Sequence, residues 1–93
     1  MIDNKLIGRV VYSKAGRDAE KYYLIVSELD DEYVYISDGD IRKIENPKKK
    51  KLKHLNIEDK TCEDIRNSLL TGNRVSNTQI RKFLKSEDIN KEV

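Results

Sequence analysis

Basic side chains are concentrated in one short stretch of this chain, between positions 42 and 54. They are Arg42, Lys43, Lys48, Lys49, Lys50, Lys51 and Lys53. The stretch has a net charge of +6, whereas residues 1–41 carry −4 and residues 55–93 are neutral, so the overall charge of +2 hides a local positive field. Like charges held together repel one another unless a polyanion binds. The stretch is therefore suited to contact phosphate groups, whose counterions lysines displace; a solvated loop that binds nothing is the simpler alternative.

Residues for other kinds of chemistry are scarce. His54 is the only histidine and Cys62 the only cysteine, so we expect neither a metal site nor an internal disulfide. The chain has no glycine-rich phosphate loop of the Walker type and no nucleophile with a neighbouring base. We therefore expect a protein that is not an enzyme and that uses no cofactor or small-molecule substrate. His54 is expected at the surface among the lysines.

Three apolar runs rich in β-branched and aromatic residues precede the basic stretch. They predict strands at Leu6 to Tyr12, Tyr22 to Leu29 and Tyr33 to Asp38. The connection from Ser13 to Lys21 is predicted to form a projecting basic loop, in which Gly16 takes a positive φ. The short acidic turn at residues 30–32 is typical of a hairpin. Together these signals indicate an antiparallel meander.

The meander is expected to continue into the basic stretch. Asp38-Gly39 predicts a two-residue type I′ turn that leads into a fourth strand at residues 41–44. Pro47 limits strand pairing around the lysines. The alternation from Lys51 to Leu55 then suggests a short closing strand.

Strand periodicity divides the side chains of the third run between two faces. Val34 and Ile36 fall on the face expected to be core, and Tyr33 and Tyr35 fall on the other. The two tyrosines could stack on unpaired bases, or they could pack beneath the C-terminal segment, which we favour because a small domain needs its aromatic residues for burial. Of Tyr22 and Tyr23, which lie on opposite faces, only one can be core.

The residues after Leu55 have a helical pattern. Thr61 is a candidate N-cap for a helix to about Leu70, with Cys62 as a small buried residue on its apolar side. Ser76 and Gln79 have capping-box spacing and predict a second helix to about residue 86. Both helices are too short to be stable alone and must dock on the strands. Residues 87–93 are expected to fray. A DNA-binding helix-turn-helix, with Arg81, Lys82 and Lys85 on its second helix, is a less favoured alternative because this segment is neutral.

The length of 93 residues is that of one domain. We divide it into residues 1–57 with the strands and basic loop, residues 58–86 with the two helices, and the tail. The chain shows no apolar run of the length of a signal peptide or a membrane-spanning helix. We therefore expect a cytoplasmic protein without a membrane partner.

The segment from Ile7 to Lys21, IGRVVYSKAGRDAEK, followed by an apolar strand, resembles the KOW motif of KOW-domain RNA-binding proteins, the bacterial relatives of a class of large-subunit ribosomal proteins. The resemblance extends through the Asp38-Gly39 turn and the lysine run to Leu55. One position departs from the family pattern G-R-D-x-G-K, because Glu20 stands where the second glycine usually occurs.

This resemblance implies a small SH3-like antiparallel β-barrel that binds structured RNA in or near the ribosome. The residues expected to contact RNA are Lys14, Arg17, Lys21, Arg42, Lys43, Lys48, Lys49, Lys50, Lys51, Lys53 and His54. KOW barrels also occur in transcription elongation factors, so a module that binds a protein of a transcription or translation complex is the alternative. A protein partner would use an exposed apolar patch, whereas RNA would use the lysines with strongly salt-dependent affinity.

Overall fold

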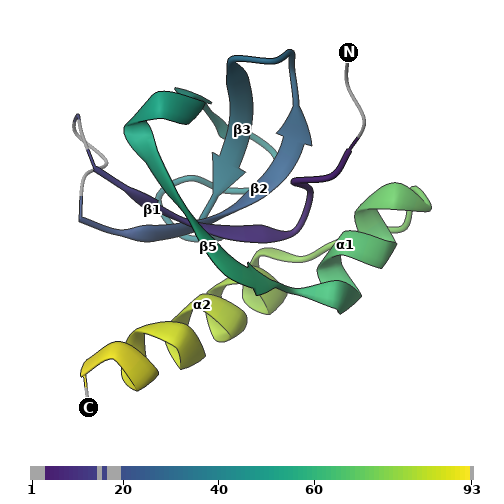
Figure 1. The fold of residues 1–93 in the computed structure, drawn as a ribbon. Coiled ribbons are helices and arrows are strands. Elements are labelled where there is room, and N and C mark those ends of the chain that lie inside the picture. Colours follow the sequence, from purple (N-terminus) through teal and green to yellow (C-terminus); the bar gives the residue numbers. More distant parts are fainter. Residues whose placement is uncertain (1–3, 15, 17–19, 93) are drawn as a thin grey trace.

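The computed structural model describes residues 4–14, 16 and 20–92, with side chains described up to residue 86. Its strands are β1 (Arg9–Ser13), β2 (Tyr22–Glu28), β3 (Tyr33–Ser37), β4 (Lys48–Lys51) and β5 (Leu55–Thr61). A short 3-10 helix, η1 (Leu52–His54), joins β4 to β5, and the helices α1 (Glu63–Leu70) and α2 (Asn77–Glu92) follow. The strands form one antiparallel sheet in the order β4-β3-β2-β1-β5. The expected class, mainly β with two C-terminal helices, is confirmed (Figure 1).

The sheet has a hydrophobic cluster on each face, because neighbouring side chains along a strand point to opposite sides. The inner cluster consists of Val11, Tyr23, Ile25, Val34, Ile36 and Leu55. The helix-covered cluster consists of Val10, Leu24 and Val26 from the sheet and Ile65, Val75, Ile80 and Leu84 from the helical segment. Both helices lie on one side of the sheet (Figure 1). The prediction that Val34 and Ile36 are core is confirmed, and Tyr23 rather than Tyr22 is the fully buried member of its pair.

The sheet curls strongly toward the inner cluster. In a flat sheet of five strands the two edge strands would lie about 19 Å apart. Lys51 at the end of β4 and Leu55 at the start of β5 are joined by only three residues, which span at most about 15 Å when fully extended and less in a 3-10 helix. The edges must therefore approach each other at this point. The described strands nevertheless form an open sheet with β4 and β5 as its edges, so a closed barrel of SH3-like type stays a prediction.

The predicted fourth strand at residues 41–44 is wrong, and the lysine run itself forms β4. Residues after Ser37 close a compact loop instead, in which the Arg42 carbonyl accepts hydrogen bonds from the Asp38 and Gly39 N–H groups and from the Ser37 hydroxyl. The Asp38 carboxylate accepts from the Asp40 and Arg42 N–H groups, each at 2.9 Å. Gly39 has φ +74° but Asp38 is not in the left-handed region, so the turn is not type I′. Because the loop satisfies its own polar groups, it has few left for a strand ladder.

Three other predicted boundaries also differ. The first strand begins at Arg9 rather than Leu6, because Gly8, at φ +84°, turns the chain where the backbone packs against Arg66. Residues 52–54 form η1 instead of a closing strand, and the closing strand β5 comes after them. Thr61 does not cap α1, because it pairs with Arg9 in the ladder between β1 and β5. Cys62 is the N-cap residue instead.

Helix α2 is held at its start by the predicted capping box. The Ser76 N–H donates to Gln79 Oε1 at 2.9 Å, and the Gln79 N–H donates to the Ser76 hydroxyl at 3.1 Å, which confirms this prediction. Asn77 ties the helix to the loop before β4: its Oδ1 accepts from the Ile44 N–H at 2.8 Å, and its Nδ2 donates to the Glu45 carboxylate. The helix continues to Glu92, beyond the expected end near residue 86, since an established helix extends at little cost. No helix in the described part of the chain is long and apolar enough to cross a membrane.

Candidate nucleic-acid interface

The four lysines of β4 are divided between the two faces of the sheet. The antiparallel register pairs Lys48 with Ile36 and Lys50 with Val34, which belong to the inner cluster. The same register pairs Lys49 with Tyr35 and Lys51 with Tyr33. The side chains of these four residues lie on the opposite face of the sheet, which also carries the helix-covered cluster and which we call the outer face. The basic run is therefore not a single patch. We call Lys49 and Lys51 the outer lysine pair, and Lys48 and Lys50 the inner lysine pair.

Within the inner pair, Lys50 is almost completely buried, and the residue is only 8% exposed. Its aliphatic stem lies on the face of the inner cluster, and its ammonium group reaches the loop between β1 and β2. A Cβ atom built on Gly16 would lie 3.0 Å from Lys50 Nζ. Gly16 also has φ +85°, which confirms the predicted positive φ. Glycine at this position thus lets the loop turn and approach the lysine, so Lys50 connects the loop to β4.

The outer lysine pair gathers around one aromatic ring. Lys49 Nζ lies 4.8 Å and Lys51 Nζ 5.6 Å from the centroid of the Tyr33 ring, within the range of a cation–π interaction. Tyr35, the next tyrosine on this face, packs instead against the helix-covered cluster. The expectation that the tyrosines pack beneath the C-terminal segment therefore holds for Tyr35, whereas Tyr33 contacts lysines.

The loop between β1 and β2 carries further cations, and the strand register places it at the Ser37 end of β3, away from Tyr33. Lys14 and Lys21 are exposed at its two ends. The Lys14 N–H donates to the His54 carbonyl at 2.9 Å, which fixes the loop beside η1. His54 itself is partly buried. Arg17, which we expected to contact RNA, lies outside the described residues.

Glu20 has an unusual backbone conformation in this loop. Its φ of +66° is in the left-handed region, where residues other than glycine are uncommon. Its N–H donates to the Ser13 carbonyl at 2.8 Å, and the Ser13 N–H donates to the Lys21 carbonyl at 3.0 Å. These two bonds close the base of the loop. Glu20 therefore occupies a position at which the backbone favours glycine.

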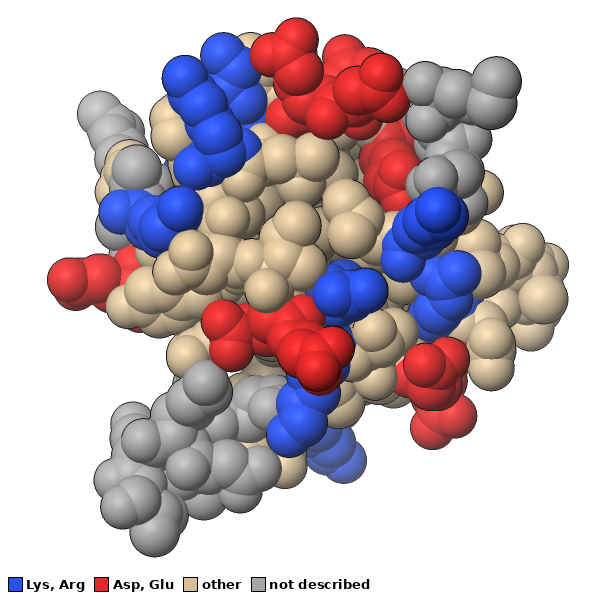
Figure 2. Space-filling model, in the orientation of Figure 1, with Lys and Arg blue, Asp and Glu red and all other residues tan. Residues whose placement is uncertain are grey.

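Acidic residues border the outer lysine pair on one side. The turn between β2 and β3 contributes Asp31 and Glu32 to a hollow of about 280 Å³, whose other wall is formed by Lys51, Leu52 and Lys53. Figure 2 shows acidic residues gathered over the β2–β3 turn directly beside basic residues. Two N–H groups, of Glu32 and Tyr33, donate to Asp30 Oδ1 at 2.8 Å each, and these bonds lower the pKa of that carboxyl, with a smaller contribution from the Lys49 charge. The positive field of β4 is thus limited at this end.

Arg42 and Lys43 belong to a different part of the molecule from Lys51. They lie in the loop that is tied to the start of α2 through Ile44 and Glu45. Arg42 is partly buried and Lys43 is exposed. These two residues precede the Lys48 end of β4, whereas Lys51 pairs with Tyr33 near the acidic turn. The sequence cluster of seven basic residues is therefore spread over the loop before β4, the strand itself and η1.

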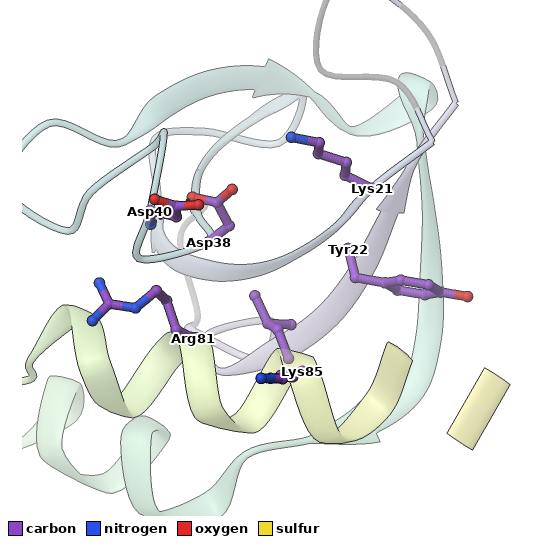
Figure 3. Close-up of a pocket in the computed structure, with 7 residues that line it drawn as sticks. Lys21, Tyr22, Asp38, Asp40, Arg81 and Lys85 are labelled. Atoms are coloured by element: carbon purple, nitrogen blue, oxygen red, sulfur yellow. Dashed lines mark hydrogen bonds between the residues drawn. The ribbon is translucent and has the colours of Figure 1, made fainter. Parts of the chain in front are cut away.

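A second hollow, of about 300 Å³, combines a predicted RNA-binding residue with the C-terminal helix. Figure 3 shows Lys21 on one side of it and Arg81 and Lys85 of α2 on the other, with Asp38 and Asp40 at one end. Arg81 donates to the Gly39 carbonyl at 2.7 Å and to the Thr78 hydroxyl at 3.2 Å, so it holds the loop on the helix. The spacing of Arg81 and Lys85 by four residues placed them on one helix face, but nothing in the sequence indicated that Lys21 lies opposite.

The described residues contain no cluster of three or more histidine, cysteine, aspartate or glutamate side chains that could hold a metal ion. Cys62, expected as a small buried residue, is partly buried beside the helix-covered cluster, and desolvation raises the pKa of its thiol. A free thiol with a raised pKa is a poor nucleophile at neutral pH. Comparison of the chain with protein-family models finds no match, and comparison with curated proteins finds none either.

Proposed function

We propose that this chain is a non-enzymatic cytoplasmic RNA-binding module, an SH3-like barrel of the KOW type that binds structured, ribosomal RNA in translation. The observation that carries the proposal is that four consecutive lysines form an edge strand whose outer pair lies around a tyrosine ring. Lysines held at fixed spacing along a strand match the repeating charge of a phosphate backbone and bind it through counterion release.

The curvature of the sheet supports the barrel type. The three-residue connection η1 brings the edge strands β4 and β5 together, and the inner cluster contains residues from β1, β2, β3 and β5. A sheet that surrounds its own core in this way is close to closure.

The loop between β1 and β2 supports the KOW type. Gly16 has φ +85°, and Glu20, at the position of the family's second glycine, has φ +66°. The backbone thus follows a glycine-like path even where the glycine has been replaced. Lys14 and Lys21 at the loop ends would give a second contact to RNA, and His54 and Lys53 lie beside Lys14 through η1.

The test is a titration of purified protein with structured ribosomal RNA fragments at salt concentrations from about 50 to about 200 mM, with an expected slope of roughly four to six released counterions. In Lys49→Gln/Lys51→Gln the affinity should fall at least tenfold while the circular dichroism spectrum is unchanged. The matched control, Lys82→Gln/Lys85→Gln, removes the same charge from α2 and should bind like the wild type. An absence of binding at low salt, or loss only in the control variant, would refute the proposal; the latter result would favour the helix-turn-helix alternative.

Lysines on an edge strand also have a purely structural explanation, because they discourage pairing with a second copy of the chain. The same variants separate the two roles. If the outer lysine pair serves only to protect the edge, Lys49→Gln/Lys51→Gln should form dimers or aggregates in sedimentation experiments, and the wild-type protein should show no salt-dependent RNA binding.

One observation favours the alternative, a module that binds a protein. Ile41 is 66% exposed, although the loop that carries it is fixed by the hydrogen bonds of Asp38 and Arg42. A rigidly held apolar side chain resembles the anchor residue of a protein interface. Ile41→Ser should weaken binding to such a partner, recovered from a ribosomal or transcription complex, and leave RNA affinity unchanged.

A further inference from the structure

Tyr33 has no evident role in the hydrophobic core. It is partly buried, but it belongs to neither hydrophobic cluster, in contrast to Tyr23 in the inner cluster and Tyr35 beside the helix-covered cluster. Its ring instead lies beneath two ammonium groups, at 4.8 and 5.6 Å from the ring centroid. The reason for an aromatic residue at this position must therefore be sought in its contact with the lysines.

The contact follows directly from the strand register. Tyr33 pairs with Lys51, and Lys49 is two residues away on the same face of β4, so both ammonium groups can reach the ring. The N–H of Tyr33 donates to Asp30 Oδ1, and this bond fixes the start of β3. The ring is thus anchored at its backbone, and its electron-rich face attracts both cations.

A free lysine side chain samples many rotamers, and this freedom is lost when its ammonium group binds a phosphate. A ring that already restricts two lysines reduces that loss, which is the general basis of preorganisation. The ring also offsets part of the repulsion between the two ammonium groups. Lys49 and Lys51 would then act as one unit rather than as two independent charges.

We propose that Tyr33 is a positioning residue that holds Lys49 and Lys51 in place for contact with the phosphate backbone of RNA. The inference rests on the proposed RNA-binding function and adds to it which lysines bind and what orders them. It also assigns Tyr33 a role other than stacking on a base.

The first experiment is a double-mutant cycle on RNA affinity. Tyr33→Leu should weaken binding about three- to tenfold, while the slope of affinity against salt stays close to that of the wild type because both lysines remain. Tyr33→Phe retains a ring and should bind like the wild type. In the Lys49→Gln/Lys51→Gln background, Tyr33→Leu should cause no further loss.

Other outcomes would overturn the inference in distinct ways. An equal loss from Tyr33→Leu with and without the two lysines would mean that Tyr33 contacts RNA itself, by stacking on a base. A loss that appears only with unpaired RNA and not with duplex RNA would lead to the same conclusion. Unchanged affinity in Tyr33→Leu would show that ordering of the lysines contributes nothing.

A second measurement needs no RNA and separates this inference from the proposed function. Protons on the Cε atoms of Lys49 and Lys51 should show upfield ring-current shifts in the NMR spectrum of the free protein, and these shifts should disappear in Tyr33→Leu but not in Tyr33→Phe. Shifts in a protein that fails to bind RNA would leave the geometry intact and refute the function. RNA binding without such shifts would refute the positioning role alone.

Discussion

Lys49 and Lys50 are neighbours in the chain with identical side chains, yet they occupy opposite environments. Lys49 is exposed on the outer face of β4 and lies over the Tyr33 ring, whereas Lys50 is 8% exposed on the inner face with its ammonium group at Gly16. The difference arises from strand geometry alone, because alternate residues of a strand face opposite sides. In a strand, a run of like charges is therefore divided between the two faces of the sheet. In this protein the run divides into an outer pair, which we propose binds RNA, and an inner pair, of which Lys50 is buried.

The largest effect on stability should come from the inner face. Lys50→Ala removes a buried aliphatic stem and should lower the free energy of unfolding by about 1–2 kcal/mol. Lys49→Ala, an identical change at the preceding residue of the same edge strand, should lower the free energy of unfolding by less than about 0.5 kcal/mol. RNA affinity should follow the opposite order. Urea unfolding and RNA titration of both variants measure the contrast, and equal losses of stability would contradict the division of the strand into two faces.

A smaller effect is expected where acidic residues border the outer lysine pair. Asp31→Asn/Glu32→Gln removes two negative charges from the hollow shared with Lys51 and Lys53. RNA affinity at low salt should rise about threefold, and the gain should shrink as salt screens the charges. The control Asp59→Asn/Glu63→Gln removes the same charge from β5 and α1 and should change affinity less. If both variants gain equally, only the net charge of the protein matters and not its arrangement.

The smallest effect concerns Asp30, whose carboxylate accepts a hydrogen bond from the Tyr33 N–H. The pKa of the Asp30 carboxyl is lowered by the N–H groups of Glu32 and Tyr33 and, to a smaller extent, by Lys49. A carboxyl with a lowered pKa stabilises the fold at pH values above its ordinary value of 3.8, and this contribution is lost as the pH falls through the folded-state pKa. Thermal unfolding between about pH 5 and about pH 2 should therefore show a steeper loss in the wild type than in Asp30→Asn. Parallel curves would mean that the Asp30 bonds do not persist in solution.

Local patterns in the sequence were enough to predict much of this fold. Apolar runs rich in β-branched and aromatic residues located β2 and β3 closely, and the capping box of Ser76 and Gln79 located the start of α2. These features depend on residues close in the chain. The prediction of Gly16 at positive φ succeeded for the same reason.

The remaining features depend on contacts between distant segments. Four successive lysines have low strand propensity, and they form β4 because β3 offers a ladder. Threonine is a common helix N-cap residue, but Thr61 pairs with Arg9 and is therefore part of β5. For the candidate site, the sequence predicted the basic residues individually, but it could not predict that Lys50 is buried or that Tyr33 lies beneath Lys49 and Lys51. Those facts require the register between β3 and β4.

The order of the strands has a consequence for the folding of this chain during its synthesis on the ribosome. Strands β1 to β4 pair with neighbours in sequence order, so a meander of four strands can form as soon as residue 51 has emerged. One edge of β1 stays unpaired until β5 has been synthesised, because residues 55–61 pair with residues 9–13 to complete the sheet. Such non-local pairing is slow compared with hairpin formation. During synthesis the hydrophobic strand β1 is thus a temporary edge, and prompt arrival of β5 protects the nascent chain from pairing with its neighbours.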